Sequence, residues 1–228
     1  MQSEGEWIAA ALLPDGVGSL VPPVFEAYAR VFHPAVRYDG DDDVEVSWAE
    51  VAAVNGTLDH PRMQWAAVTG GWEYLGTDCQ PPTWDDAPAE GHLPAEVAAR
   101  LAVVLTAHTT TPGICLFGVW AAFGFGVPGP TLALPRDRDV TLVRGTVADA
   151  ARNLAPEPQE QSANLWWPGN RAWCVATDID LRSTYVGGSR ACVDALLDVP
   201  DLEVWAVDPA DPVGLRDDDV NPVPPGGP

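Results

Sequence analysis

The sequence contains no lysine, and its only basic side chains are arginines and histidines. Twelve arginines are spread from Arg30 to Arg216 among 33 acidic residues, which gives a formal net charge of −21. Binding to a nucleic acid depends on cationic side chains that neutralise phosphates, so dispersed arginines in an acidic chain predict no nucleic-acid partner. An anionic membrane surface is disfavoured on the same grounds. The charge favours solubility or a basic protein partner.

Long apolar runs are also missing, because none approaches the roughly 18 residues of a membrane-spanning helix. The first residues, MQSEGEWIAAALLPDG, begin with an acidic segment, where a secretory signal would begin with a basic one. The four cysteines are far apart and none belongs to a C-x-x-C pair, so we expect reduced thiols. These features predict a cytoplasmic protein.

Familiar catalytic and cofactor patterns are scarce. The four histidines lack paired spacing, and no G-x-S-x-G elbow supplies an activated serine. His108 follows the apolar stripe of a predicted helix, which favours a structural role. Gly124 to Gly129 matches the dinucleotide fingerprint, but Pro128 and Pro130 exclude a helix that could receive a pyrophosphate. We therefore expect no cofactor.

One acidic segment has the spacing of a calcium-binding loop. Asp39, Asp41, Asp43, Ser47 and Glu50 fall at ligand positions of an EF-hand. However, a valine stands where the tight turn needs glycine, and the preceding segment is predicted to be a strand and not an entering helix. The same serine and glutamate form a capping box that begins a short helix. We expect no metal ion here.

What the sequence does contain is a composition that folds, with 46% apolar residues and ten tryptophans. The clearest helix is expected from Pro94 to about Ala107, and another after Ser189. Strands are expected over residues 24–33, 114–121, 131–134, 140–144, 173–179, 184–186 and 202–207.

Together these elements predict a single α+β domain over residues 1–208, an antiparallel or mixed sheet of about six strands with flanking helices. Residues 209–228 are rich in Pro, Gly and Asp, and are expected to form a disordered tail.

The segment RAWCVATDIDLRSTYVGGSR, residues 171–190, concentrates chemically capable groups. Asp178 and Asp180 would share one face of a strand, where two carboxylates can act as an acid and base pair, chelate a cation or bind an arginine. Alternatively they accept turn N–H bonds or pair with Arg171, Arg182 or Arg190, which would make them structural.

The same segment offers two further candidate sites. Trp167, Trp173, Arg182 and Tyr185 could line a ligand pocket beside the two aspartates, although aromatic residues near a hairpin are more often core. The candidate anion site is a strand end that leads into a helix N-terminus, where free N–H groups could hold an anion, unless the glycines merely permit a tight turn. Its residues are Gly187, Gly188, Ser189 and Arg190.

Four segments, YARVFHPA (residues 28–35), SWAEVA (47–52), RAWCVATDID (171–180) and STYVGGS (183–189), resemble a group of hypothetical proteins from high-GC bacteria. The resemblance would cover most of the folded chain. It implies a cytoplasmic origin and one fold unit, and it transfers no catalytic residues.

Two classes of function remain. The first is a non-enzymatic interaction protein, of the immunity or inhibitor type, whose Asp178 and Asp180 recognise a basic partner. The second is a small-molecule binder or enzyme with a Trp- and Asp-lined pocket near residues 166–190. A deep apolar cleft with convergent polar groups favours the second class, and a flat acidic face favours the first.

Overall fold

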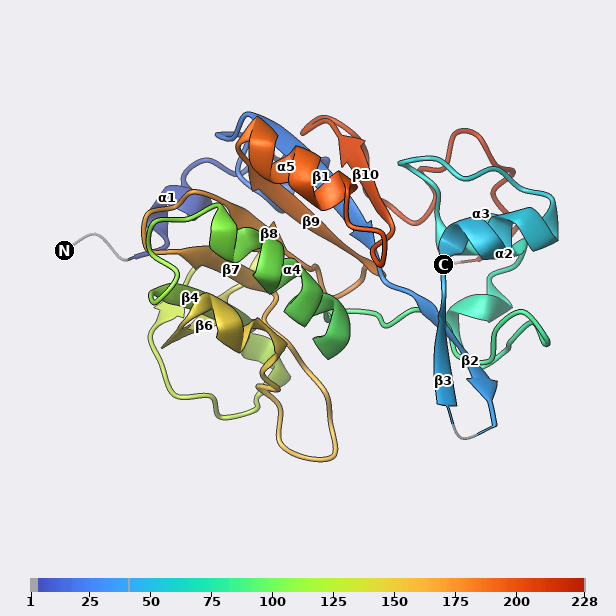
Figure 1. The fold of residues 1–228 in the computed structure, drawn as a ribbon, viewed down its shortest axis with the longest axis horizontal. Coiled ribbons are helices and arrows are strands. Elements are labelled where there is room, and N and C mark those ends of the chain that lie inside the picture. Colours follow the sequence, from blue (N-terminus) through green and yellow to red (C-terminus); the bar gives the residue numbers. More distant parts are fainter. Residues whose placement is uncertain (1–3, 41, 228) are drawn as a thin grey trace.

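The computed structural model describes residues 4–40 and 42–227. Its centre is an eight-stranded antiparallel sheet with the strand order β10-β1-β9-β8-β7-β4-β6-β5 (Figure 1). A separate antiparallel hairpin joins β2 (Ala35–Asp39) and β3 (Asp42–Val46). The strands of the main sheet are β1 (Ala27–Phe32), β4 (Cys115–Trp120), β5 (Thr131–Leu132), β6 (Val140–Gly145), β7 (Leu165–Pro168), β8 (Cys174–Ala176), β9 (Ser183–Gly188) and β10 (Val204–Val207).

The α+β class and the antiparallel sheet are confirmed. The strand β7 and the β2–β3 hairpin had no counterpart among the predicted strands, because LWWP does not alternate and the hairpin carries an acidic stretch that resembles a loop.

Helices lie before and between the strands. The capping box that was predicted at Ser47 is present: its Oγ accepts from the Glu50 N–H, and Glu50 accepts from the Ser47 N–H. The α-helices are α1 (Glu6–Ala9), α2 (Trp48–Asn55), α3 (Trp65–Thr69), α4 (Ala95–Ala107) and α5 (Arg190–Leu197). The 3-10 helices are η1 (Val17–Ser19), η2 (Glu73–Leu75), η3 (Ala121–Phe123), η4 (Pro135–Asp137) and η5 (Val147–Ala151).

Alternation along the central strands sends apolar side chains to both faces of the sheet. In β4, Phe117 joins one core and Leu116 the other; in β7, Trp166 and Trp167 divide in the same way. Helices α4 and α5 cover the first face (Figure 1). The N-terminal segment of the chain, which includes α1 and η1, packs on the second face. The sheet is therefore buried on both sides.

A third core lies beside the sheet and is built by the hairpin, α2 and α3. We call it the tryptophan core because its rings form a continuous series, Phe32–Trp48–Trp65–Trp84, with centroid separations of 4.7, 5.1 and 5.2 Å. In Figure 1 this part stands at the right of the main sheet, next to the C-terminus.

Two buried arginines, one in the main sheet and one directly before it, hold this region in place. Arg30 in β1 donates from Nε to Ser183 and from one terminal nitrogen to the carbonyls of Pro61 and Met63. Arg182, just before β9, donates to the carbonyls of Pro88 and Leu75 and pairs with Glu90. These bonds hold irregular segments whose carbonyl groups would otherwise be buried without donors.

The segment after Asp208 differs from the disordered tail expected from its composition. Asp218 accepts hydrogen bonds from the Gln64 N–H and from His60, and Asn221 exchanges two bonds with the Leu58 backbone. Both tail side chains are buried. Specific hydrogen bonds thus connect this segment to residues 58–64.

No helix within residues 4–40 and 42–227 is long and apolar enough to cross a bilayer.

Candidate functional site

Asp178 and Asp180 lie in the connection between β8 and β9, and both bind Arg138. Arg138 Nε lies 3.1 Å from Asp178 Oδ2, and a terminal nitrogen of the same guanidinium pairs with Asp180. The Asp178 side chain is 13% exposed and that of Asp180 is 65% exposed. Strand β8 ends at Ala176, so the two carboxylates belong to a turn and not to one strand face.

The arginine that binds them was not among the three partners considered from the sequence, because Arg138 lies 40 residues away along the chain. Burial lowers the pKa of this guanidinium, but the hydrogen bond and charge of Asp178, with the charge of Asp180, outweigh burial and raise it. We call Arg138, Asp178 and Asp180 the ion-pair cluster. In this cluster both carboxylates are already paired with a cation of the same chain.

Arg138 belongs to the β5–β6 connection, whose backbone is strained. Arg136 and Asp137 have φ values of 61° and 57°, in the left-handed region that non-glycine residues rarely adopt. Several hydrogen bonds fix this loop. Trp120 Nε1 donates to the Asp137 carbonyl, the Leu134 N–H donates to Asp139, and Arg136 donates to the Ser19 carbonyl at 3.1 Å. Such strain persists only where surrounding contacts impose it, and it clusters at functional sites.

Under this loop lies a cavity that we call the Arg136 pocket. Its polar lining residues are Ser19, Arg136, Arg138, Asn164, Thr177 and Asp178. The remaining lining residues are Ile8, Leu12, Leu20, Trp120, Leu134, Pro135, Val140, Leu165, Ala176 and Ile179. The space between the lining atoms is about 500 Å³ and is partly open to solvent. The centre of a water molecule fits into only about 50 Å³ of this space, so the pocket is a narrow slot.

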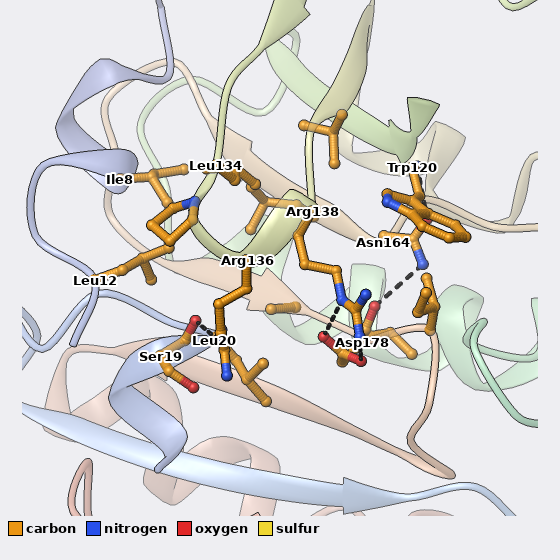
Figure 2. Close-up of a pocket in the computed structure, with 16 residues that line it drawn as sticks. Ile8, Leu12, Ser19, Leu20, Trp120, Leu134, Arg136, Arg138, Asn164 and Asp178 are labelled. Carbon is orange, nitrogen blue, oxygen red and sulfur yellow. Dashed lines mark hydrogen bonds and ion pairs between the residues drawn. The ribbon is translucent and has the colours of Figure 1, made fainter. Parts of the chain in front are cut away.

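Figure 2 shows how the two arginines cross the pocket. They extend from one loop, Arg136 toward Ser19 and Arg138 toward Asp178. Ile8, Leu12 and Leu134 lie on the Arg136 side, and Trp120 and Asn164 lie on the Arg138 side.

Asn164 has its polar atoms occupied. Its Oδ1 accepts from the Trp120 N–H at 2.9 Å, and its Nδ2 donates to the carbonyls of Gly91 and Thr177. It therefore positions the two strand ends that frame the pocket and leaves no amide proton for a ligand.

A buried polar chain begins at the next lining residue. Thr177 and Thr184 are linked by their hydroxyls at 2.6 Å, and Thr184 Oγ lies 2.8 Å from His33 Nε2. His33 Nδ1 lies 2.7 Å from the Ala89 carbonyl, which can only accept, so Nδ1 carries the proton. Burial lowers the pKa of His33 to about 3, which keeps this ring neutral.

The aromatic residues expected to line a pocket are instead part of the core. Trp167 and Trp173 lie on opposite faces of the sheet, and Trp173 Nε1 donates to the Leu105 carbonyl. Tyr185 is buried on the same face as Trp167, and Arg182 fastens the segments near Leu75 and Pro88. None of these four residues lines the Arg136 pocket.

The strand-to-helix junction considered as an anion site already has an anion. The Arg190 N–H donates to the Glu26 carboxylate at 3.0 Å, and Ser189 Oγ caps α5 by accepting from the Cys192 N–H. Gly187 is required for packing, because a Cβ there would lie 2.6 Å from Phe25. Gly188 pairs with Ala27 inside the sheet.

The segment with EF-hand spacing forms the β2–β3 hairpin with Gly40 at its turn. Asp41 lies outside the described residues. Among those that are described, no group of three or more His, Cys, Asp or Glu side chains is arranged to hold a metal ion.

A second hollow lies between the hairpin, the start of α2, α4 and residues 200–203 before β10, with about 300 Å³ open to the centre of a water molecule. It is larger and more polar than the Arg136 pocket, but its main carboxylates are bound within the chain. Glu45 pairs with Arg100, Glu50 caps α2, and Glu203 accepts from the N–H groups of Trp48 and Ala49. These interactions stabilise the junction between the hairpin, α2 and α4.

Comparisons with protein-family models, with curated proteins and with solved structures find no match for this chain. The choice of a site therefore depends on geometry alone. Sequence reasoning missed Arg136, Arg138 and Trp120, although PRDRD carried a signal: two arginines two positions apart, in a turn, separated by an aspartate.

Proposed function

We propose that the protein binds a small molecule with a slender apolar body in the Arg136 pocket. The observation that carries this proposal is the pocket itself, a mostly apolar slot with a few polar groups at its two ends. Binding sites have this composition because apolar walls supply affinity and polar groups fix orientation.

The strained loop supports the same site. Two consecutive left-handed residues cost about 1 to 2 kcal/mol each, and a loop that served only to connect β5 and β6 could avoid this cost with glycine or asparagine. Here the strained backbone directs Arg136 and Arg138 across the pocket.

Recognition of a basic protein by Asp178 and Asp180 stays a prediction. The net charge of −21 supports it, since an acidic field attracts a basic partner. Such a partner would have to compete with Arg138 for both carboxylates, however, and Asp178 is mostly buried. The geometry thus supports the small-molecule proposal better.

We also propose a cytoplasmic location. Cys115, Cys174 and Cys192 are free and buried, as expected for thiols that pack as small apolar groups in a reducing compartment.

The test of the binding function uses 1,6-diphenylhexatriene, a neutral, rod-shaped apolar dye that becomes fluorescent when it leaves water. We expect saturable binding that the pocket-filling substitution Ala176→Met weakens several-fold, because Ala176 lines the slot. The control Ala210→Met makes the same change at an exposed position and should bind as the unchanged protein does. Equal binding by all three proteins, with unchanged thermal melting, would place the dye elsewhere and contradict the proposal.

A further inference from the structure

The two arginines of the pocket differ in how their charges are compensated. The Arg138 guanidinium binds two carboxylates, those of Asp178 and Asp180. Arg136 makes one hydrogen bond, to the neutral carbonyl of Ser19, and has no ion pair with any residue in 4–40 or 42–227. A guanidinium has five N–H donors, so Arg136 has both a free charge and donors available for a ligand.

The surroundings of Arg136 define what such a ligand must look like. The side chain is exposed at the rim and lies beside Ile8, Leu12 and Leu134 (Figure 2). A ligand that contacts both features has an anionic end against the guanidinium and an apolar body in the slot.

At the opposite end of the pocket, the charge of Arg138 is already compensated by Asp178 and Asp180, and the neutral side chains there offer no free donors. Both amide protons of Asn164 are donated to carbonyls. The hydroxyl chain has a fixed direction: His33 Nε2 accepts from Thr184, so Thr184 accepts from Thr177 and the Thr177 proton is used. An anionic group would find acceptors and the Asp178 carboxylate there, and it would be repelled.

Resting on the proposed function, we propose that the ligand is a carboxylate with a slender apolar chain, and that Arg136 is the residue that selects its charge. The planar fork of a guanidinium matches a carboxylate through two parallel hydrogen bonds. A dianionic group such as a phosphate monoester would carry a second charge that one guanidinium does not neutralise, in the field of a chain with a net charge of −21. A single negative charge fits the site best.

The test compares three ligands that share one chain and differ in charge: octanoate, octan-1-ol and octylammonium. Titration calorimetry on the full chain should rank octanoate first, about tenfold tighter than the alcohol, the range of a charge-assisted hydrogen bond. Arg136→Gln should remove that advantage and leave binding of the alcohol unchanged, while Arg136→Lys should retain part of it. The control Arg144→Gln also removes one arginine charge, at an exposed side chain outside the pocket, and should leave all three affinities unchanged.

Each other outcome has a distinct meaning. Tightest binding of octylammonium would overturn the inference and show that Asp178 and Asp180 dominate the pocket, as the basic-partner hypothesis expects. Equal binding of all three ligands, or an octanoate advantage that survives Arg136→Gln, would also overturn it while leaving an apolar binding site in place. Binding of none of them, together with loss of dye binding, would contradict the proposed function itself.

Discussion

The tryptophan core and the Arg136 pocket use arginine in opposite ways. Arg30 and Arg182 are buried, and their terminal nitrogens donate to carbonyls or to a carboxylate of segments that pack on the sheet. At the pocket, Arg136 stands exposed on a left-handed backbone with one bond to a neutral acceptor. The comparison suggests that the arginines which stabilise this fold are buried and have most of their N–H donors hydrogen-bonded. An arginine that is available to a ligand instead lies exposed at the rim of the pocket.

The largest expected effect is at Arg30. Arg30→Met keeps much of the side-chain volume but leaves the carbonyls of Pro61 and Met63 and the Ser183 hydroxyl without their donor. We expect a loss of about 3 to 5 kcal/mol in the free energy of unfolding, measured by urea denaturation. Arg138→Gln, which breaks a partly exposed ion pair, should cost about 1 kcal/mol or less. Similar losses for the two variants would remove the proposed difference between the regions.

The second effect concerns His33, which joins the two regions through Thr184 and Thr177. Burial lowers its pKa from 6.5 to about 3, so the unfolded chain binds a proton here that the folded chain refuses. Its contribution to stability is complete above about pH 6.5 and is lost as the pH falls toward 3, which amounts to about 3 kcal/mol by pH 4. Urea denaturation at pH 7 and pH 4 should show a smaller decrease for His33→Gln than for the unchanged protein. His108→Gln should keep the full decrease, and an equal decrease in all three proteins would contradict the assignment.

Glu203 should show the reverse sign. Burial raises its pKa to about 7, against the lowering effect of the Trp48 and Ala49 N–H groups. The folded chain then binds a proton that the unfolded chain releases above about pH 4.5. The contribution of Glu203 to the free energy of unfolding therefore falls by about 1 to 2 kcal/mol as the pH rises from 4.5 to beyond 7, after allowance for its partial exposure. Glu203→Gln should flatten the curve between pH 5 and pH 8, whereas Glu45→Gln should leave it unchanged. A curve with the same slope in both variants would mean that Glu203 stays ionised.

The elements that local pattern specifies were predictable from the sequence. The capping box of α2, the apolar stripe of α4, the central strand β4 and the β5–β6 hairpin all follow from residues within a few positions of each other. The tryptophan core was not predictable in this way, because Trp48, Trp65 and Trp84 meet only through tertiary packing.

The candidate site was likewise predictable only in part. Asp178 and Asp180 were recognised as a pair that could bind an arginine, which they do. Which arginine binds them depends on strand order: β4 lies between β7 and β6, and this arrangement brings the β5–β6 loop to the end of β8. Nothing near Arg138 in the sequence reports that contact, and the positive φ of Arg136 is a property of the folded loop alone.

The smallest expected effect isolates the strain itself. At a φ of 61°, glycine avoids the steric cost that any Cβ meets, so Arg136→Gly should be more stable to urea than Arg136→Ala by about 1 kcal/mol. Arg171 has a φ of 57° and does not line the pocket, so Arg171→Gly should exceed Arg171→Ala by a similar amount. Only the substitutions at Arg136 should abolish the preference for octanoate over octan-1-ol, because strain is common to both positions while contact with the ligand is not. A loss of that preference in the Arg171 variants would show that loop strain elsewhere, and not the Arg136 guanidinium, determines the selectivity.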